Sequence, residues 1–246
     1  LSINSISKIK AQIVWTLHDM WAFTGGCHYS DGCHRYTDNC GNCPVLNSKK
    51  NKDISYRILK YKARHFKNLS HIIAPSQWIG EQASKSSLLK NIPISFIGYG
   101  IDHDLYSKKN QNIARNNLGI KSSRRIVLFG ALSADSDIRK GFDLLFKAIP
   151  LMKSMFDVIV FGGKSKETII DDFGHKIFKL GHLDNEQSII DAYSAADLMV
   201  VPSREDNLPN TAIEALMCSL PVVGFNIGGM PDMIKHEKNG YLAKPF

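Results

Sequence analysis

Short apolar runs alternate along the chain with longer segments in which apolar residues recur at helical spacing. The apolar runs predict β-strands at residues 12–17, 71–75, 93–97, 125–129, 157–161, 176–180, 197–201 and 221–225. Helical spacing predicts α-helices over residues 56–68, 77–90, 140–153, 186–195 and 211–218. Because strands that alternate with helices pair in parallel, this pattern predicts an α/β fold with parallel sheets.

A polar stretch at residues 107–124 is the predicted domain linker. It separates an N-terminal domain, residues 1–115, from a second domain, residues 116–246. With 246 residues, of which 43% are hydrophobic, the chain can build two modest cores. No apolar run approaches the ~18 residues of a membrane-spanning helix, and no signal peptide is visible, so a cytoplasmic protein is expected.

The most informative chemistry lies in residues 202–216, between a predicted buried strand and the start of a predicted helix. This stretch holds two acids, Asp206 and Glu214. A helix N-terminus offers unpaired N–H groups to an anion, and carboxylates accept hydrogen bonds from hydroxyls. Together these features indicate a nucleotide-sugar site; the alternative is that the acids are ordinary solvated charges.

This stretch resembles the motif of the group 1 family of retaining glycosyltransferases. Asp206 and Glu214 are two acids separated by seven residues, Pro-Val-Val follows at 221–223, and Gly-Gly-Met-Pro-Asp follows at 228–232. The chain departs from the family in two places. The first acid is usually Glu, and the usual Gly-x-Gly is replaced by Asn-Leu-Pro-Asn at 207–210.

The resemblance implies the GT-B fold, in which two Rossmann-like domains with parallel sheets face each other across a cleft. The chain begins with Leu1 and stops soon after an apolar run at 240–242, so we expect a fragment truncated at both ends. The implied activity is transfer of a sugar from a nucleotide diphosphate to a glycan or polyprenyl-linked glycan, with retention at the anomeric carbon. Such enzymes serve bacterial polysaccharide and cell-envelope glycan synthesis, and catalysis in the family requires no cofactor.

The resemblance also implies a set of donor-binding residues. Arg139 and Lys140 precede the first helix of the second domain, where a guanidinium fork and an ammonium group suit a diphosphate. The family usually places an arginine directly after the glycine of the first strand, here Gly130, but this chain has Ala131. Arg139 is therefore expected to replace that arginine; the alternatives are a weaker phosphate contact or a solvated basic pair.

The acids have separate expected roles. Glu214 is expected to hold the ribose hydroxyls, and Asp206 is the catalytic candidate that orients the hydroxyls of the sugar. Glu205, shifted by one position, is the alternative counterpart of the first acid. The complete donor-binding set is Gly130, Arg139, Lys140, Glu205, Asn207, Leu208, Asn210 and Glu214.

A second catalytic candidate, His18, lies directly after the first predicted strand. By resemblance, a histidine at this place faces the donor sugar, so His18 is expected to position or polarise it. The alternative is a structural histidine. Thr-Gly-Gly at 24–26 is expected to form a tight turn on the acceptor side.

Four of the five cysteines fall in one Cys-rich loop at residues 27–43: Cys27, Cys33, Cys40 and Cys43. Clustered thiols in a cytosolic chain favour a metal over disulfides. The spacing of Cys40 and Cys43 is that of a zinc half-site, whereas Cys27 and Cys33 lie farther apart than the usual pair. We expect a structural Zn²⁺ ion, with buried reduced thiols or two disulfides as the alternatives.

The net charge of +8 is concentrated in residues 47–70, where eight Lys or Arg residues accompany a single acid, Asp53. A basic, partly amphipathic helix can rest on an anionic membrane surface, which suits a polyprenyl-linked acceptor at the inner face of the plasma membrane. The alternative is a helix with a solvated basic face and an apolar stripe in the core.

Three rival functions remain open at this point. A sugar-nucleotide epimerase of the same GT-B architecture would need no acceptor. A zinc-stabilised nucleic-acid-binding module would use the cysteines and the basic helix, but it leaves the acid pair unexplained, so no nucleic-acid partner is expected. A truncated, inactive relative is the third.

Overall fold

The computed structural model describes residues 2–130, 137–171 and 173–246; Ala131 lies outside the described residues. The chain divides into two compact units, Leu1–Tyr99 and Gly100–Phe246. This division lies earlier than the predicted boundary at 115/116.

The segment predicted as a linker contains a packed helix, so the linker prediction is wrong for these residues. Helix α4 (Gln111–Asn117) packs against α6 (Glu186–Ala195) in the second unit. The buried guanidinium of Arg115 donates to the carbonyl of Ala195 at 2.9 Å and pairs with Asp197 at 3.1 Å. A polar composition therefore does not make this segment a linker. Its Arg115 is buried because it is the partner of buried oxygen atoms of the second unit.

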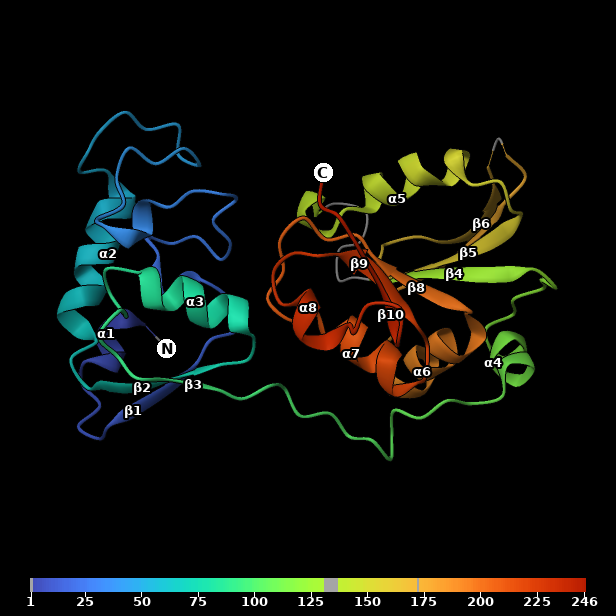
Figure 1. Ribbon diagram of the computed structural model, residues 1–246, viewed down its shortest axis with the longest axis horizontal. Helices are drawn as coiled ribbons and strands as arrows, with labels where there is room; N and C mark the ends of the chain where they lie inside the picture. Colours follow the sequence, from blue (N-terminus) through green and yellow to red (C-terminus); the bar gives the residue numbers. More distant parts are fainter. Residues whose placement is uncertain (1, 131–136, 172) are drawn as a thin grey trace. The chain divides into compact units, whose positions relative to one another are not determined.

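The first unit is built on a parallel sheet in the order β1-β2-β3. Its elements are α1 (Ile3–Ile6), β1 (Ile13–Thr16), η1 (Trp21–Phe23), η2 (Arg35–Thr37), α2 (Ile54–His65), β2 (Leu69–Ala74), α3 (Gln77–Lys85) and β3 (Ile94–Phe96). The long connection from β1 to α2 is mostly irregular and extends past the start of α2 (Figure 1). The core of this unit includes Leu17, Met20, Phe23, Leu59, Ile72 and Ile79.

Helix α2, the predicted basic helix, turns one face inward. Its buried residues are Ser55, Leu59 and Lys62. The Lys62 ammonium donates to the carbonyls of Trp21 and, at 3.0 Å, Thr24, and it lies 3.7 Å from the centre of the Trp21 ring. Burial lowers the pKa of Lys62 to about 8. Of the apolar residues of α2, Leu59 lies in the core, whereas Ile54 and Tyr61 are exposed. One lysine of the helix lies inside with Leu59.

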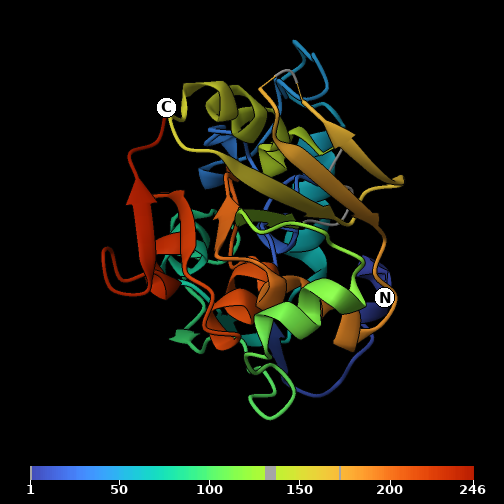
Figure 2. The same cartoon turned by 90° about the vertical axis from the view of Figure 1, so that its right-hand side faces the viewer.

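The second unit contains a seven-stranded sheet in the order β10-β9-β8-β4-β5-β7-β6. Its strands are β4 (Arg125–Gly130), β5 (Phe156–Phe161), β6 (Lys166–Ile170), β7 (Lys176–Gly181), β8 (Leu198–Val201), β9 (Val222–Phe225) and β10 (Gly240–Ala243). Neighbouring strands are parallel except β6 and β7. Figure 2 shows β9 and β10 at one edge of this sheet and β6 at the other.

Helices cover both faces of this sheet (Figure 1). They are α4, η3 (Ile138–Lys140), α5 (Phe142–Ala148), η4 (Ile149–Leu151), α6, α7 (Asn210–Met217) and α8 (Met230–Met233). Along β4, Val127 and Phe129 pack with α5, whereas Ile126 and Leu128 pack in the core that includes α6 and α7. This alternation is the period-two pattern of a strand buried on both faces, and it confirms the predicted α/β fold with parallel sheets.

Every strand predicted from the sequence overlaps a strand of the structure. The edge strands β6 and β10 were not predicted. Two helices are shorter than predicted: α3 ends at Lys85, and the segment after Lys140 divides into α5 and η4. In the part of the chain that the structure describes, every helix is too short or too polar to cross a membrane.

Strand β4 marks the point where the strand order reverses. It pairs with β5 on one side and with β8 on the other. The chain leaves β4 towards β5 and only later fills the positions of β8 and β9. In open α/β sheets, ligands bind outside the carboxyl ends of the strands at such a reversal. The ends of β4 and β8 are therefore where a ligand is expected.

Candidate functional site

Two predicted cations meet a predicted acid at the carboxyl ends of β4 and β8. Arg139 and Lys140 belong to η3, which follows β4, and Asp206 lies in the loop after β8. Lys140 Nζ lies 2.7 Å and Arg139 Nη1 3.2 Å from Asp206 Oδ2. Asp206 is only 5% exposed. A buried carboxylate needs such partners, so Asp206 fixes both cations in place.

Arg139 is fixed by further contacts. Its Nη1 donates to the backbone carbonyl of Glu205 at 3.0 Å, and its Nη2 pairs with Asp137 at 3.0 Å. The side chain of Glu205 is less buried than that of Asp206. Of the two candidates for the first acid of the motif, Asp206 therefore contacts the cations, and Glu205 is the more open to a ligand.

Two glycines let the loops of the site pack backbone against backbone. Gly141 has φ +73°, and a Cβ there would lie 1.9 Å from the carbonyl oxygen of Pro202. Gly228 has φ +56°, and its Cβ would lie 2.0 Å from the carbonyl oxygen of Asp206. Both positions therefore require glycine for its left-handed conformation and for its lack of a side chain. Gly130, at the end of β4, similarly lies against the ring of Phe161.

Helix α7 begins without a side-chain cap. Pro209 occupies the N-cap position, Asn207 and Leu208 before it are buried, and Asn210 is exposed. The N–H groups of Asn210 and Thr211 have no acceptor within the described ranges. These N–H groups at the positive end of the helix dipole can bind an anion, as the sequence predicts.

Glu214, on α7, has a different neighbourhood. Its Oε2 accepts a hydrogen bond of 2.6 Å from the hydroxyl of the buried Tyr193 on α6. Burial, with a smaller contribution from the charge of Glu186, raises the pKa of Glu214. Among the described residues, its hydrogen bond goes to Tyr193 and not to Arg139 or Lys140. Sequence reasoning missed Tyr193, which looks like an ordinary apolar position of α6.

His18 lies in the first unit, just beyond the end of β1. Its Nδ1 lies 3.0 Å from the hydroxyl of Tyr99, and the two rings stack with centroids 5.4 Å apart. Tyr99 follows β3, so parallel strands bring both residues to the same edge of the sheet. Sequence reasoning missed Tyr99. Its position after a predicted strand, with a glycine on each side, is typical of a residue at a ligand site. The residues that line a cavity of about 190 Å³ here are Trp15, Thr16, His18, Asp19, Trp21, Ala22 and His28.

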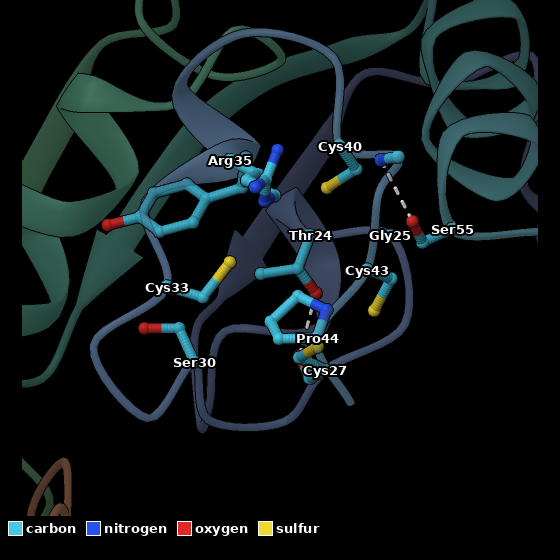
Figure 3. Close-up of a pocket in the computed structure, with 12 residues that line it drawn as sticks. Thr24, Gly25, Cys27, Ser30, Cys33, Arg35, Cys40, Cys43, Pro44 and Ser55 are labelled. Atoms are coloured by element: carbon cyan, nitrogen blue, oxygen red, sulfur yellow. Dashed lines mark hydrogen bonds between the residues drawn. The ribbon is translucent and has the colours of Figure 1, made fainter. Parts of the chain in front are cut away.

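The four cysteines of the Cys-rich loop line one small cavity together (Figure 3). None of them forms a disulfide. No three of their sulfur atoms lie within 4.8 Å of one another. The structure thus brings the predicted zinc ligands to one place, with their sulfur atoms wider apart than in a closed metal site.

Comparison with known proteins assigns the second unit to a family. The family model described as Glycosyl transferases group 1 matches residues 123–246. The putative colanic acid biosynthesis glycosyl transferase WcaC of Escherichia coli is 25% identical over 240 residues, which are 95% of this chain and 56% of that protein. A D-inositol 3-phosphate glycosyltransferase of Mycobacteroides abscessus is 27% identical over 163 residues, covering 61% of this chain and 35% of that protein.

Solved structures extend the similarity of fold to both units. Sucrose-phosphate synthase from Thermosynechococcus elongatus matches with a TM-score of 0.69 and 20% identity, over 97% of this chain and 56% of that one. HepE from Anabaena, in complex with UDP-glucose, matches with a TM-score of 0.66 and 18% identity, over 95% of this chain and 58% of that one. These similarities confirm the predicted GT-B fold.

The chain spans little more than half the length of the E. coli relative that it matches. The order of the motif residues, the acid and cation cluster at the strand reversal and the family match agree with one another. They give no support to the epimerase or the nucleic-acid-binding module. The chain belongs to the group 1 family of glycosyl transferases.

Proposed function

We propose that the protein transfers a sugar from a nucleotide-diphosphate donor to a hydroxyl of a glycan or lipid-linked glycan, with retention at the anomeric carbon. The observation that carries this proposal is the group formed by Arg139, Lys140 and the uncapped start of α7, all at the strand reversal of the second unit. Two cations and free N–H groups suit a diphosphate.

The proposed chemistry is largely electrostatic. The bond between the anomeric carbon and the diphosphate oxygen breaks, the acceptor oxygen bonds to that carbon, and the acceptor proton passes to the departing phosphate on the same face. Negative charge grows on the diphosphate, and Arg139, Lys140 and the α7 N–H groups stabilise it without moving. Asp206 acts by holding the two cations.

The remaining candidates serve recognition of the donor in this proposal. Glu214 binds the ribose hydroxyls, and the more exposed Glu205 binds hydroxyls of the transferred sugar. His18 keeps its predicted role of positioning or polarising that sugar. HepE was solved with UDP and with UDP-glucose, which makes uridine nucleotides the first donors to test.

Glu214→Ala is expected to weaken nucleotide-diphosphate binding about 10- to 100-fold with the fold retained, since a hydrogen bond to a charged group contributes about 1.5–3 kcal/mol. Calorimetry and thermal shift against UDP, GDP, ADP and their sugar conjugates measure this. Glu167→Ala, on the exposed edge strand β6, is the matched control and should bind normally. An unchanged affinity in Glu214→Ala would remove the ribose assignment, and a wild-type protein that binds none of these nucleotides would overturn the proposed function.

A lipid-linked acceptor fits the exposed face of α2. Arg57, Lys60 and Arg64 lie on this face, and exposed Lys49, Lys50 and Lys52 precede the helix. We propose that this surface contacts anionic lipid at the inner face of the plasma membrane. Cosedimentation should show binding to vesicles rich in phosphatidylglycerol, little binding to pure phosphatidylcholine, and loss of binding at high salt or in Arg57→Glu/Lys60→Glu/Arg64→Glu. Equal binding to both vesicles would reject the electrostatic contact.

A further inference from the structure

The Cys-rich loop surrounds a cavity the size of a single small ion. Cys27, Cys33, Cys40 and Cys43 line it, together with Arg35 and other residues of the loop (Figure 3). Its volume is about 20 Å³, close to what one water molecule occupies. Four thiols around a space of this size match the ligand set of a structural Zn²⁺ ion, which is held by four ligands with no open position.

The turn that carries two of these thiols is held in an unusual backbone conformation. Cys40, Gly41 and Asn42 all have positive φ, at 55°, 87° and 46°. Two of them are not glycine, and each such residue costs on the order of 1–3 kcal/mol. Contacts with the start of α2 fix the turn: Gly41 N donates to Ser55 Oγ at 3.0 Å, and Cys43 N donates to Asp53 Oδ2 at 2.9 Å.

A buried positive charge lies beside the cavity. Lys62 is fully buried; the charge of the Asp19 carboxylate acts on it, but no carboxylate of the described residues lies within salt-bridge distance of its ammonium. Its ammonium donates to the carbonyl of Thr24, which itself lines the cavity and whose hydroxyl donates to the carbonyl of Cys27 at 2.7 Å. A buried ammonium is costly unless enough negative charge lies close to it, and the Asp19 carboxylate is shared with His28, so further negative charge beside Lys62 is favourable. Neutral thiols and disulfides carry no charge and do not meet this need.

Zinc bound by four thiolates supplies that charge. The four thiolates exceed the charge of the ion by two, and the cations of Arg35 and Lys62 match this excess. We propose that Cys27, Cys33, Cys40 and Cys43 bind one Zn²⁺ ion, and that Arg35 and Lys62 neutralise its thiolate shell. In such a site the sulfur atoms lie about 3.8 Å apart, as bonds of about 2.3 Å require. Binding therefore draws the thiols inward and releases their protons.

The bound ion also steadies the cavity beside His18. Cys27 is followed by His28, whose Nδ1 lies 2.7 Å from Asp19 Oδ2, and Asp19 is the neighbour of His18. His18, Asp19 and His28 line the same cavity of about 190 Å³. The bound zinc thus stabilises the residues around this cavity of the first unit, and this role does not depend on the proposed sugar transfer.

The test is a metal titration of the reduced full chain without oxygen, with zinc counted by elemental analysis. One zinc per chain is expected in the wild type and in Cys218→Ala, a buried cysteine of the second unit that serves as control. Cys40→Ser and Cys33→Ser should lose the ion, and Lys62→Met should lower zinc affinity about 10- to 100-fold. Reduced wild-type protein that binds no zinc, or serine variants that retain it, would overturn the proposal.

Cobalt substitution keeps the test valid if the serine variants fail to fold. Co²⁺ added to wild-type protein should give the intense visible absorption and the sulfur-to-metal charge-transfer bands of a tetrahedral four-thiolate site. A cobalt spectrum typical of octahedral oxygen ligands would overturn the proposal without any variant.

Discussion

Lys140→Met is expected to lower kcat for sugar transfer about 10²- to 10³-fold, the loss typical when one preorganised donor is removed from a charge-stabilising site. The ammonium of Lys140 is held 2.7 Å from the carboxylate of Asp206 and is only partly exposed. It therefore has little freedom to reorganise while charge grows on the departing diphosphate. Initial rates with the donor identified by the nucleotide screen, compared with wild type, measure the effect.

Loss of Lys140 also leaves Asp206 with one cation fewer, and removing a partner from a buried ion pair can cost about 3–5 kcal/mol of stability. A second variant separates the two effects. Lys140→Met/Asp206→Asn removes the carboxylate charge that Lys140 no longer balances, so it should recover thermal stability while kcat stays low. If the double variant recovered both, Lys140 would be only a structural partner of Asp206.

Lys147→Met is the matched control for this experiment. Lys147 lies on α5 in the same unit, is mostly exposed, and pairs only at 3.5 Å with Asp143. An exposed pair of this kind contributes about 0–1 kcal/mol, so the variant should keep wild-type stability and activity. Equal losses in Lys147→Met and Lys140→Met would indicate a general effect of charge on the unit.

The sheet could be predicted from the sequence wherever strands are buried. The strand β5, for example, is buried at every position, and its run of apolar residues is plain in the sequence. Strand β6 was not predicted because it is an antiparallel edge strand whose side chains are mostly exposed. Exposed positions need not be apolar, so its sequence lacks the run of apolar residues that marks a buried strand. Helix α4 escaped because much of its contact with α6 is made by polar side chains, among them Gln111, Arg115 and Asn117, which composition assigns to the surface.

The site could be predicted as a set of residues but not as a set of contacts. The resemblance named Arg139 and Lys140 for the diphosphate and Asp206 for the sugar, and the structure shows that the three side chains meet. It could not show that Asp206 is buried between the cations or that Tyr193 donates to Glu214, because both depend on how α6 and α7 pack. Spacing alone likewise placed the basic helix without revealing that Lys62 points into the core.

Gly141→Ala is expected to reduce the free energy of unfolding by about 2–5 kcal/mol, one of the largest effects of any single methyl group in this chain. Alanine at φ +73° costs about 1–2 kcal/mol, and the added Cβ meets the carbonyl oxygen of Pro202 at 1.9 Å. Backbone cannot rotate away as a side chain can, so the loop after β8 must shift. That shift separates Lys140 from Asp206, and nucleotide affinity should fall as well.

Gly119→Ala isolates the steric part of this effect. Gly119 has nearly the same φ, +68°, but a Cβ there meets nothing within 4 Å, so only the cost of the left-handed conformation remains. Urea unfolding followed by circular dichroism should place Gly141→Ala well below Gly119→Ala. Tryptophan fluorescence is an internal reference, since Trp15, Trp21 and Trp78 all belong to the first unit. Equal destabilisation in the two variants would mean that the loops at Gly141 and Pro202 do not pack as closely as the structure shows. The contact between Lys140 and Asp206 depends on the same packing, so that result would also reject it.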